Sequence, residues 1–324
     1  MEQAKSHSIG IDVGKRELVA CIRCSNGITE PPAAFPNSIV GLRKFIVYLK
    51  KNNVQKDNSP ILLESTGPYH WQPARTLADN GYFVKVANPL HTKQIARLSI
   101  RKRKTDKVDA ANLAFLASQN YGYQFAETDE MARKKAAICH YWKLRSTATN
   151  LLVHERYLKE YRHISAVSVS KIIVKRCDIL KRQIIKEWNK GNNVKYLDSI
   201  PGITPFLAAT ILAELMPLSR FQRIDQIVAY AGLDPSVKQT GGKTGRHGAI
   251  SKRGSPTLRE ALFLAAFGSF SKQPMKTVYE YYKGRNLHHN TILCIIGRKI
   301  LGIAVALLRK RRMFDPKYLV GSGG

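Results

Sequence analysis

The stretch HSIGIDV at residues 7–13 predicts a β-strand that carries one acidic residue, Asp12, near its end. Residues 17–24 form a second apolar run and are expected to be the hairpin partner of this strand, with turn-forming residues following at 25–27. A free charge inside an apolar strand is costly to bury, so Asp12 must be paired or must bind something. It is the first candidate for a functional residue.

Strand-like and helix-like segments continue to alternate outward from this hairpin, up to about residue 124. Apolar residues recur with a spacing of three and four at 40–50, which predicts an amphipathic helix. The further expected elements are a strand at 60–64, a helix at 73–80, a strand at 82–86 and a long helix beginning near Thr105. This alternation predicts an α/β domain with a mixed sheet over residues 1–124.

The composition changes after this region. Glycine and proline are missing from 127 to 190, and Leu144, Leu151 and Leu158 repeat every seven residues. We expect two long helices in a region spanning 125–195, arranged as an antiparallel coiled coil or as an ordinary helical bundle. A mainly α-helical C-terminal domain is expected over 196–320, with a long polar, glycine-rich loop at 235–256. Residues 321–324, Gly-Ser-Gly-Gly, are interpreted as a tail.

Charge is the strongest signal in the composition. Lysine and arginine total 53 and aspartate and glutamate total 23, which gives a net charge of +30 over 324 residues. Such a surface repels itself unless a polyanion such as DNA or RNA neutralises it. We find no lipidation signal and no leader peptide, and cations at 298 and 299 interrupt the longest apolar run, 292–308. The chain is therefore expected in the cytoplasm, away from membranes, with its five cysteines reduced.

Three further carboxylates join Asp12. Glu64 ends the apolar strand at 60–64, while Asp106 and Asp109 open the helix near Thr105 and share a face because they are three residues apart. That face continues through apolar residues, so both aspartates are expected to point at the sheet; helix capping would explain only one of them. Four clustered carboxylates need cations, and oxygen ligands of this kind suit Mg²⁺ or Mn²⁺. Two such ions can assist the displacement of a phosphate ester.

A run of four cations lies directly before the two aspartates. Its members are Arg101, Lys102, Arg103 and Lys104. Beside a metal site, this run is expected to bind the nucleic-acid backbone.

Several motifs resemble a known family when they are taken in order along the chain. They are GIDVGK at 10–15, LESTGPY at 63–69, NPLHTK at 88–93, KTDKVDA at 104–110, SIPGI at 199–203, AGLDP at 231–235 and GxISKRGxPxLR at 248–259. Together they resemble the DEDD transposases of the IS110 class of insertion sequences, which include the invertases of pilin genes.

The resemblance implies a RuvC-like domain of the RNase H type, a coiled coil, and a C-terminal transposase domain with a nucleophilic serine. It also implies Mg²⁺, a dimer or tetramer, and a structured guide RNA (bridge RNA) that pairs with target and donor DNA.

This chain departs from the family pattern at the nucleophile. Relatives have Ser-Gly about six residues after the AGLxP element, where this sequence has Thr240 before Gly241. Thr240 is our first candidate for the attacking hydroxyl, and Ser251 is the second. The cations near them are expected to contact phosphate; they are Lys243, Arg246, Lys252 and Arg253.

Alternative functions remain open on the sequence alone. A pilin-type invertase without a guide RNA would share every motif. A metal-dependent nuclease or Holliday-junction resolvase would need only the four carboxylates, with water as the nucleophile. A non-catalytic nucleic-acid binder would gain nothing from four clustered negative charges, so the sequence argues against that reading.

Overall fold

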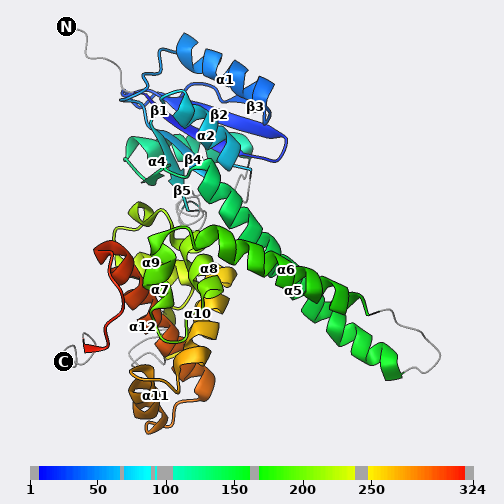
Figure 1. Ribbon diagram of the computed structural model, residues 1–324. Helices are drawn as coiled ribbons and strands as arrows, with labels where there is room; N and C mark the ends of the chain where they lie inside the picture. The colour runs from blue at the N-terminus through cyan, green and yellow to red at the C-terminus, as the bar shows by residue number, and fades with distance from the viewer. Residues whose placement is uncertain are drawn as a thin grey trace. The chain divides into compact units, whose positions relative to one another are not determined.

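The computed structural model describes residues 7–65, 69–88, 92, 105–160, 168–237 and 247–317. The chain divides into two compact units, residues 1–127 and 128–324, each with its own elements (Figure 1). The predicted α/β region corresponds to the first unit. The helix-rich region and the C-terminal region, expected as separate domains, fall together in the second. The tail at 321–324 and the basic run at 101–104 lie outside the described residues.

A six-stranded mixed sheet forms the centre of the first unit, which confirms the predicted layout. Its strands are β1 (Ser8–Val13), β2 (Glu17–Arg23), β3 (Ala33–Pro36), β4 (Ile61–Glu64), β5 (Val84–Ala87) and β6 (Tyr123–Gln124), in the order β3-β2-β1-β4-β5-β6. β1 pairs with β4 and β4 with β5 in parallel, whereas the β1–β2, β2–β3 and β5–β6 pairs are antiparallel. The ends of β1 and β4 therefore lie at the same edge.

Helices cover both faces of this sheet. Because side chains alternate along a strand, Ile9 and Ile11 of β1 face one way and Gly10 and Asp12 face the other. The isoleucines belong to a core with α1 (Ile39–Lys51) and α2 (Trp71–Asp79). The opposite face packs on α4 (Asp106–Ser118), whose Leu113, Leu116 and Ala117 meet β4 at Leu62. Asp12 is thereby directed to the face that α4 covers.

Two long helices open the second unit, as predicted. α5 (Asp129–Glu160) and α6 (Val169–Trp188) lie side by side (Figure 1), and one end of the pair packs on α8 (Pro205–Leu215). Glu155 of α5 accepts hydrogen bonds from the main-chain N–H and the hydroxyl of Ser170, at the start of α6. The finer prediction of a coiled coil stays a prediction.

The C-terminal elements are mainly helical. They are α7 (Asn192–Asp198), α8, the short 3-10 helix η1 (Leu218–Arg220), α9 (Ile224–Ala231), α10 (Pro256–Ser269), α11 (Met275–Lys283) and α12 (His289–Lys310). α12 is long and apolar enough to cross a membrane, but Ile292, Ile296 and Ile300 are among its ten buried residues and belong to the core of this unit. It is a core helix of the unit, as its interrupting cations predicted.

The segment at 235–256, expected to be one long loop, contains paired strands. β7 (Pro235–Val237) and β8 (His247–Ile250) form an antiparallel hairpin, with Pro235 opposite Ile250. Its polar, glycine-rich sequence has no alternating apolar pattern, so composition gave no signal for these strands. The hairpin leads directly into α10.

Candidate active site

A glycine brings the helix of the candidate site onto the sheet. A Cβ atom on Gly10 would lie 2.1 Å from the main-chain nitrogen of Ala114 and 2.2 Å from the carbonyl oxygen of Ala110. The backbones of β1 and α4 therefore touch, which only glycine on the strand and small residues on the helix allow. This close approach places the first turn of α4, with its two aspartates, beside the end of β1.

Strand register brings Asp12 and Glu64 to the same edge. Gly10 pairs with Leu62 and Ile11 with Leu63, so Asp12 and Glu64 follow at the next position of each parallel strand. Both side chains are half-buried. Glu64 accepts a hydrogen bond of 2.7 Å at Oε2 from the hydroxyl of Thr92.

The pKa of the Asp12 carboxyl depends on the other three predicted acids. Its pKa is raised from 3.8 to about 6, with burial as the largest cause. The negative charges of Asp106, Asp109 and Glu64 add to the rise in that order. A hydrogen bond from the main-chain N–H of Val13 opposes it. Asp12 is therefore within electrostatic reach of each of the other three carboxylates predicted from sequence.

The orientation expected for the aspartate pair is partly wrong. Asp109 is half-buried, but Asp106 is exposed, because the buried stripe of α4 begins one turn later, at Ala110. Capping by aspartate is also ruled out for this helix. The N-cap is Thr105, whose hydroxyl accepts a hydrogen bond from the N–H of Val108 at 3.3 Å. The two aspartates are therefore not used as caps.

The donor set fits a hard divalent cation in its chemistry, since all four groups offer carboxylate oxygens whose like charges oppose one another. Within the described part of the chain, however, no three side chains of His, Cys, Asp or Glu lie close enough together to hold one ion. Unneutralised carboxylates repel, and Glu64 is engaged by Thr92. Ligation by Asp12, Glu64, Asp106 and Asp109 stays a prediction.

The second group of predicted residues belongs to the β7–β8 hairpin. Thr240, Lys243 and Arg246 fall between the two strands and lie outside the described residues. Lys252 and Arg253, directly after β8, are exposed and so available to a phosphate backbone. The structure does not test their contacts with nucleic acid.

Ser251, the second candidate nucleophile, has a partner that sequence reasoning missed. Its hydroxyl donates a hydrogen bond to the carboxylate of Asp234, and its main-chain N–H donates to the Asp234 carbonyl at 2.8 Å. Asp234 lies in the AGLDP motif, seventeen residues earlier, so no local spacing pointed to the pair. The AGLDP motif is the feature of the sequence that could have pointed to Asp234.

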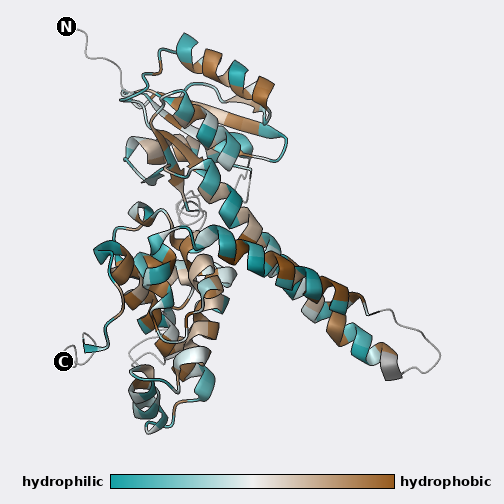
Figure 2. Cartoon of the chain, in the orientation of Figure 1, coloured by the Kyte–Doolittle hydropathy of each residue, from teal (hydrophilic) through white to brown (hydrophobic). Residues whose placement is uncertain are grey.

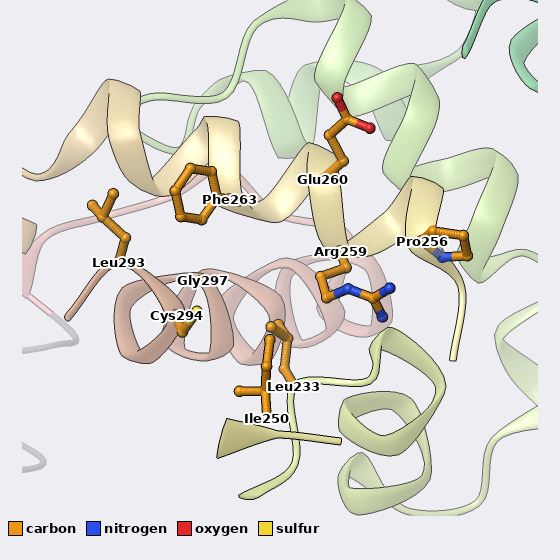
Figure 3. A pocket seen from close by; sticks show the side chains of 9 residues that line it. All are labelled: Leu233, Ile250, Pro256, Arg259, Glu260, Phe263, Leu293, Cys294 and Gly297. Carbon is orange, nitrogen blue, oxygen red and sulfur yellow. The ribbon is translucent and has the colours of Figure 1, made fainter. Parts of the chain in front are cut away.

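A pocket of about 420 Å³ lies beside the base of the hairpin. Figure 3 shows Leu233 and Ile250 together on one side, with Cys294 on α12 and the side chain of Arg259 extending from α10. The carboxylate of Glu260 points away from Leu233 and Ile250 (Figure 3). The part of the pocket next to the hairpin is therefore mainly apolar.

Known proteins match both units of the chain. Residues 9–139 match the family model described as a DEDD transposase of the IS110 type, and residues 194–283 match the model of the transposase IS116/IS110/IS902 family. Pilin gene-inverting proteins of Moraxella bovis and Moraxella lacunata are 26% and 27% identical to the chain; each match covers 95% of this chain and 98% of the relative. An insertion element IS110 protein of Streptomyces coelicolor is 29% identical over 39% of this chain and 31% of its own length.

A solved structure of T. thermophilus RuvC in complex with a Holliday junction substrate is also similar, with 12% identity, a TM-score of 0.28, and coverage of 37% of this chain and 99% of that one.

These family and sequence matches define the class of the protein as a DNA-processing enzyme, a transposase or recombinase. Within that class, the chain belongs to the IS110 family of transposases.

Proposed function

We propose that this protein is the site-specific recombinase of an insertion sequence, which cuts and rejoins DNA strands at a divalent-metal site formed by Asp12, Glu64, Asp106 and Asp109. The observation that supports this most is the electrostatic coupling of Asp12 to the other three carboxylates at the end of β1. Mg²⁺ or Mn²⁺ bound there would polarise the scissile phosphate and favour ionisation of the attacking hydroxyl. The chain's own residues supply the anionic oxygens and the fixed edge that holds them.

Asp106→Asn is the sharpest test of the carboxylate site, because this residue is exposed and its replacement should leave the fold intact. We expect recombination of a plasmid that carries the element's ends to be lost in Mg²⁺, with an unchanged melting temperature. Asp57→Asn, which removes an equivalent exposed charge elsewhere in the unit, is the matched control. Full recombination by Asp106→Asn would remove this residue from the site.

The attacking group is proposed to be the hydroxyl of Thr240. Its oxygen forms a bond to phosphorus, the bond from phosphorus to one deoxyribose oxygen breaks, and the hydroxyl proton ends on the freed strand end. Rejoining reverses these steps with a new strand end, and Lys252 and Arg253 steady the charge on the phosphate. Support comes from the sequence position of Thr240, which follows the AGLDP motif and falls between β7 and β8.

Mapping of the protein–DNA adduct tests this assignment. After denaturant quenching, mass spectrometry should find DNA on the peptide that contains Thr240. Thr240→Ala should abolish the adduct, and Thr240→Ser should keep or raise activity because the crowding methyl is removed. A link on Ser251 would move the nucleophile there. Intact cutting without any adduct would favour a nuclease or junction resolvase that uses water.

A guide RNA is proposed as the second nucleic-acid partner, alongside donor and target DNA. The net charge of +30 is compatible with several polyanions at once. The alternative is a DNA invertase without RNA, which is favoured by the match to pilin gene-inverting proteins over nearly their whole length. RNA of one defined sequence that co-purifies with the protein would decide for guidance, and its absence from an active preparation would decide for the invertase.

The working form is proposed to be a homo-oligomer, a dimer or a tetramer, in the bacterial cytoplasm and associated with the nucleoid. Hydrophobic residues lie along the helix pair (Figure 2). Several large apolar side chains among them are exposed, and another copy of that pair could cover them. They are Leu152, Val153, Tyr157, Leu158, Val169, Ile172 and Ile179. All five cysteines are unpaired, as a reducing compartment would leave them.

A further inference from the structure

The pocket between the hairpin base, α10 and α12 runs from the core of the second unit to its surface. Leu233 and Leu293, which line it, are buried, whereas Pro256 and Glu260, which also line it, are exposed. Its volume of about 420 Å³ falls in the range of roughly 300–1,000 Å³ that is usual for pockets that bind small molecules. The pocket is therefore open to solvent and large enough for a ligand with a ring system.

The side chains around this pocket suit a flat ring that carries hydrogen-bond acceptors. Phe263 is half-buried and points from α10 toward α12 (Figure 3), and an aromatic ring at this position can stack on another ring. Arg259 adds a polar group. Its Nη1 donates to the carbonyl oxygen of Ala231 at 3.1 Å, which holds the guanidinium in place, and a guanidinium has five N–H donors in all.

Positive charge lies next to the pocket. A Cβ atom on Gly232 would lie 2.5 Å from Nη1 of Arg259 and 3.0 Å from the main-chain carbonyl carbon of Lys252, so these two residues meet at the same glycine. Burial raises the pKa of the Cys294 thiol, which lines the pocket, and the charges of Lys252 and Arg259 lower it. The carboxylate of Glu260 points away from the hairpin side (Figure 3). An anionic ligand is therefore favoured at the hairpin side.

We propose that this pocket holds one nucleobase of the DNA strand, turned out of the base stack. The proposal rests on the proposed function, in which Lys252 and Arg253 contact the phosphate at the point of strand exchange. Both follow directly on β8, whose last residue, Ile250, lines the pocket, and both are exposed. A nucleotide joins an anionic phosphate to a flat ring, and these two parts match the cations and the pocket beside them. Stacking and hydrogen bonds to its edge offset the cost of unstacking a base.

A fluorescent base analogue tests the proposal without any need for strand cleavage. 2-Aminopurine becomes brighter when it leaves the base stack. It is placed at one position at a time in duplex DNA that carries the element's ends, and the full chain is added in EDTA. Fluorescence should rise several-fold at one position beside the exchanged phosphate and stay constant at the others. If no position responds although fluorescence anisotropy shows that the DNA is bound, the proposal is overturned.

Filling the pocket provides the second test. Cys294 is half-buried on α12, and Cys294→Phe places a ring in the space that the base would occupy. We expect this variant to lose the fluorescence rise and to bind DNA about 10-fold more weakly, the scale of one lost base contact. Ser271→Phe, which adds the same ring at an exposed position of the same unit, is the control and should keep both properties.

An abasic site separates this effect from general damage to the protein. When the base is removed at the responding position, Cys294→Phe and the unmodified protein should bind the DNA equally well. An equal loss of affinity on abasic and intact DNA would overturn the proposal. If Cys294→Phe has a lowered melting temperature, Phe263→Leu takes its place, because it keeps an apolar side chain and removes only the ring. It should bind intact DNA several-fold more weakly and abasic DNA normally.

Two further measurements separate the base pocket from the other proposals. Asp106→Asn should keep the fluorescence rise while it loses recombination. Full recombination by this variant would overturn its role in the metal site and leave the base pocket standing. A fluorescence rise with the analogue in a bound RNA, and at no position of the DNA, would overturn the assignment of the pocket to DNA.

Discussion

Asp12 combines burial with three neighbouring negative charges, and this makes its ionisation unfavourable to the folded state. Its pKa of about 6 in the folded protein lies above the ordinary 3.8. The unfolded chain therefore releases this proton first as the pH rises from about 4 to about 6, and the folded state loses stability across that window. Above the window the penalty is constant, and below it there is none.

Asp12→Asn should consequently stabilise the metal-free protein. In EDTA at pH 7, we expect the free energy of unfolding to rise by on the order of 1 kcal/mol, after allowing for solvent screening of a half-buried group. The gain should shrink to nothing near pH 4. Denaturant titrations at several pH values measure it, with Asp57→Asn as the control. A gain that is the same at pH 4 and pH 7 would mean that ionisation of Asp12 is not its source.

Gly10 and Gly302 form a matched pair for testing the contact between β1 and α4. Gly10→Ala must push the two backbones apart and should cost about 1–3 kcal/mol of stability, the usual range for overpacking. Gly302, within α12, has no neighbouring atom within 4 Å of an added Cβ. Gly302→Ala should therefore stabilise the protein by about 0.5–1 kcal/mol. Urea unfolding of both variants checks the contrast, and equal effects would contradict the close approach.

At the scale of elements, patterns within short stretches of sequence predicted those strands and helices that depend mainly on neighbouring residues. The apolar run at 7–13 and the helical spacing at 40–50 predicted β1 and α1, because both patterns are formed by residues that are neighbours in the sequence. β3 and β6 were missed. β6 has only two residues, and the pairing of β3 with β2 depends on distant sequence.

The residues of the candidate site also divide into those that short stretches of sequence predict and those that they do not. The four acids could be proposed from the sequence because each lies near the end of a predicted strand or at the start of a predicted helix. The exposure of Asp106 depends on where α4 crosses the sheet, and the Asp234–Ser251 pair depends on how a hairpin closes. Neither the exposure of Asp106 nor the pairing of Asp234 with Ser251 can be predicted from a short stretch of sequence.

The helix pair α5–α6 provides a prediction about assembly. Ile172 is 62% exposed, and we expect Ile172→Glu to weaken self-association because it places a charge in the apolar surface that another copy would cover. Sedimentation velocity at micromolar concentration measures the shift, with circular dichroism to confirm that the helices remain. Ile39→Glu, at a position 61% exposed on α1, is the control. An unchanged sedimentation coefficient would show that the pair is not the contact.

At the scale of the whole molecule, the excess of positive charge should dominate affinity for DNA. Each phosphate contact releases about one counterion, so the logarithm of the binding constant should fall steeply and linearly with the logarithm of salt concentration. Arg253→Gln should reduce that slope by about one, and Arg43→Gln, at an exposed position on α1, should leave it unchanged. Fluorescence anisotropy from 50 to 300 mM salt gives the slopes. A flat dependence would refute the electrostatic account.

The backbone contact at Gly10 also affects how easily a copy of the gene loses its activity by mutation. Every missense change in a glycine codon adds at least a Cβ atom, and at this position such an atom meets the main chain of α4. No conservative replacement exists, so a single base change can separate the aspartates of α4 from Asp12 while most of the protein still folds. Copies that carry such a change would be transcribed and translated yet remain in place. Among related copies in one genome, those altered at this codon are expected to be the stationary ones.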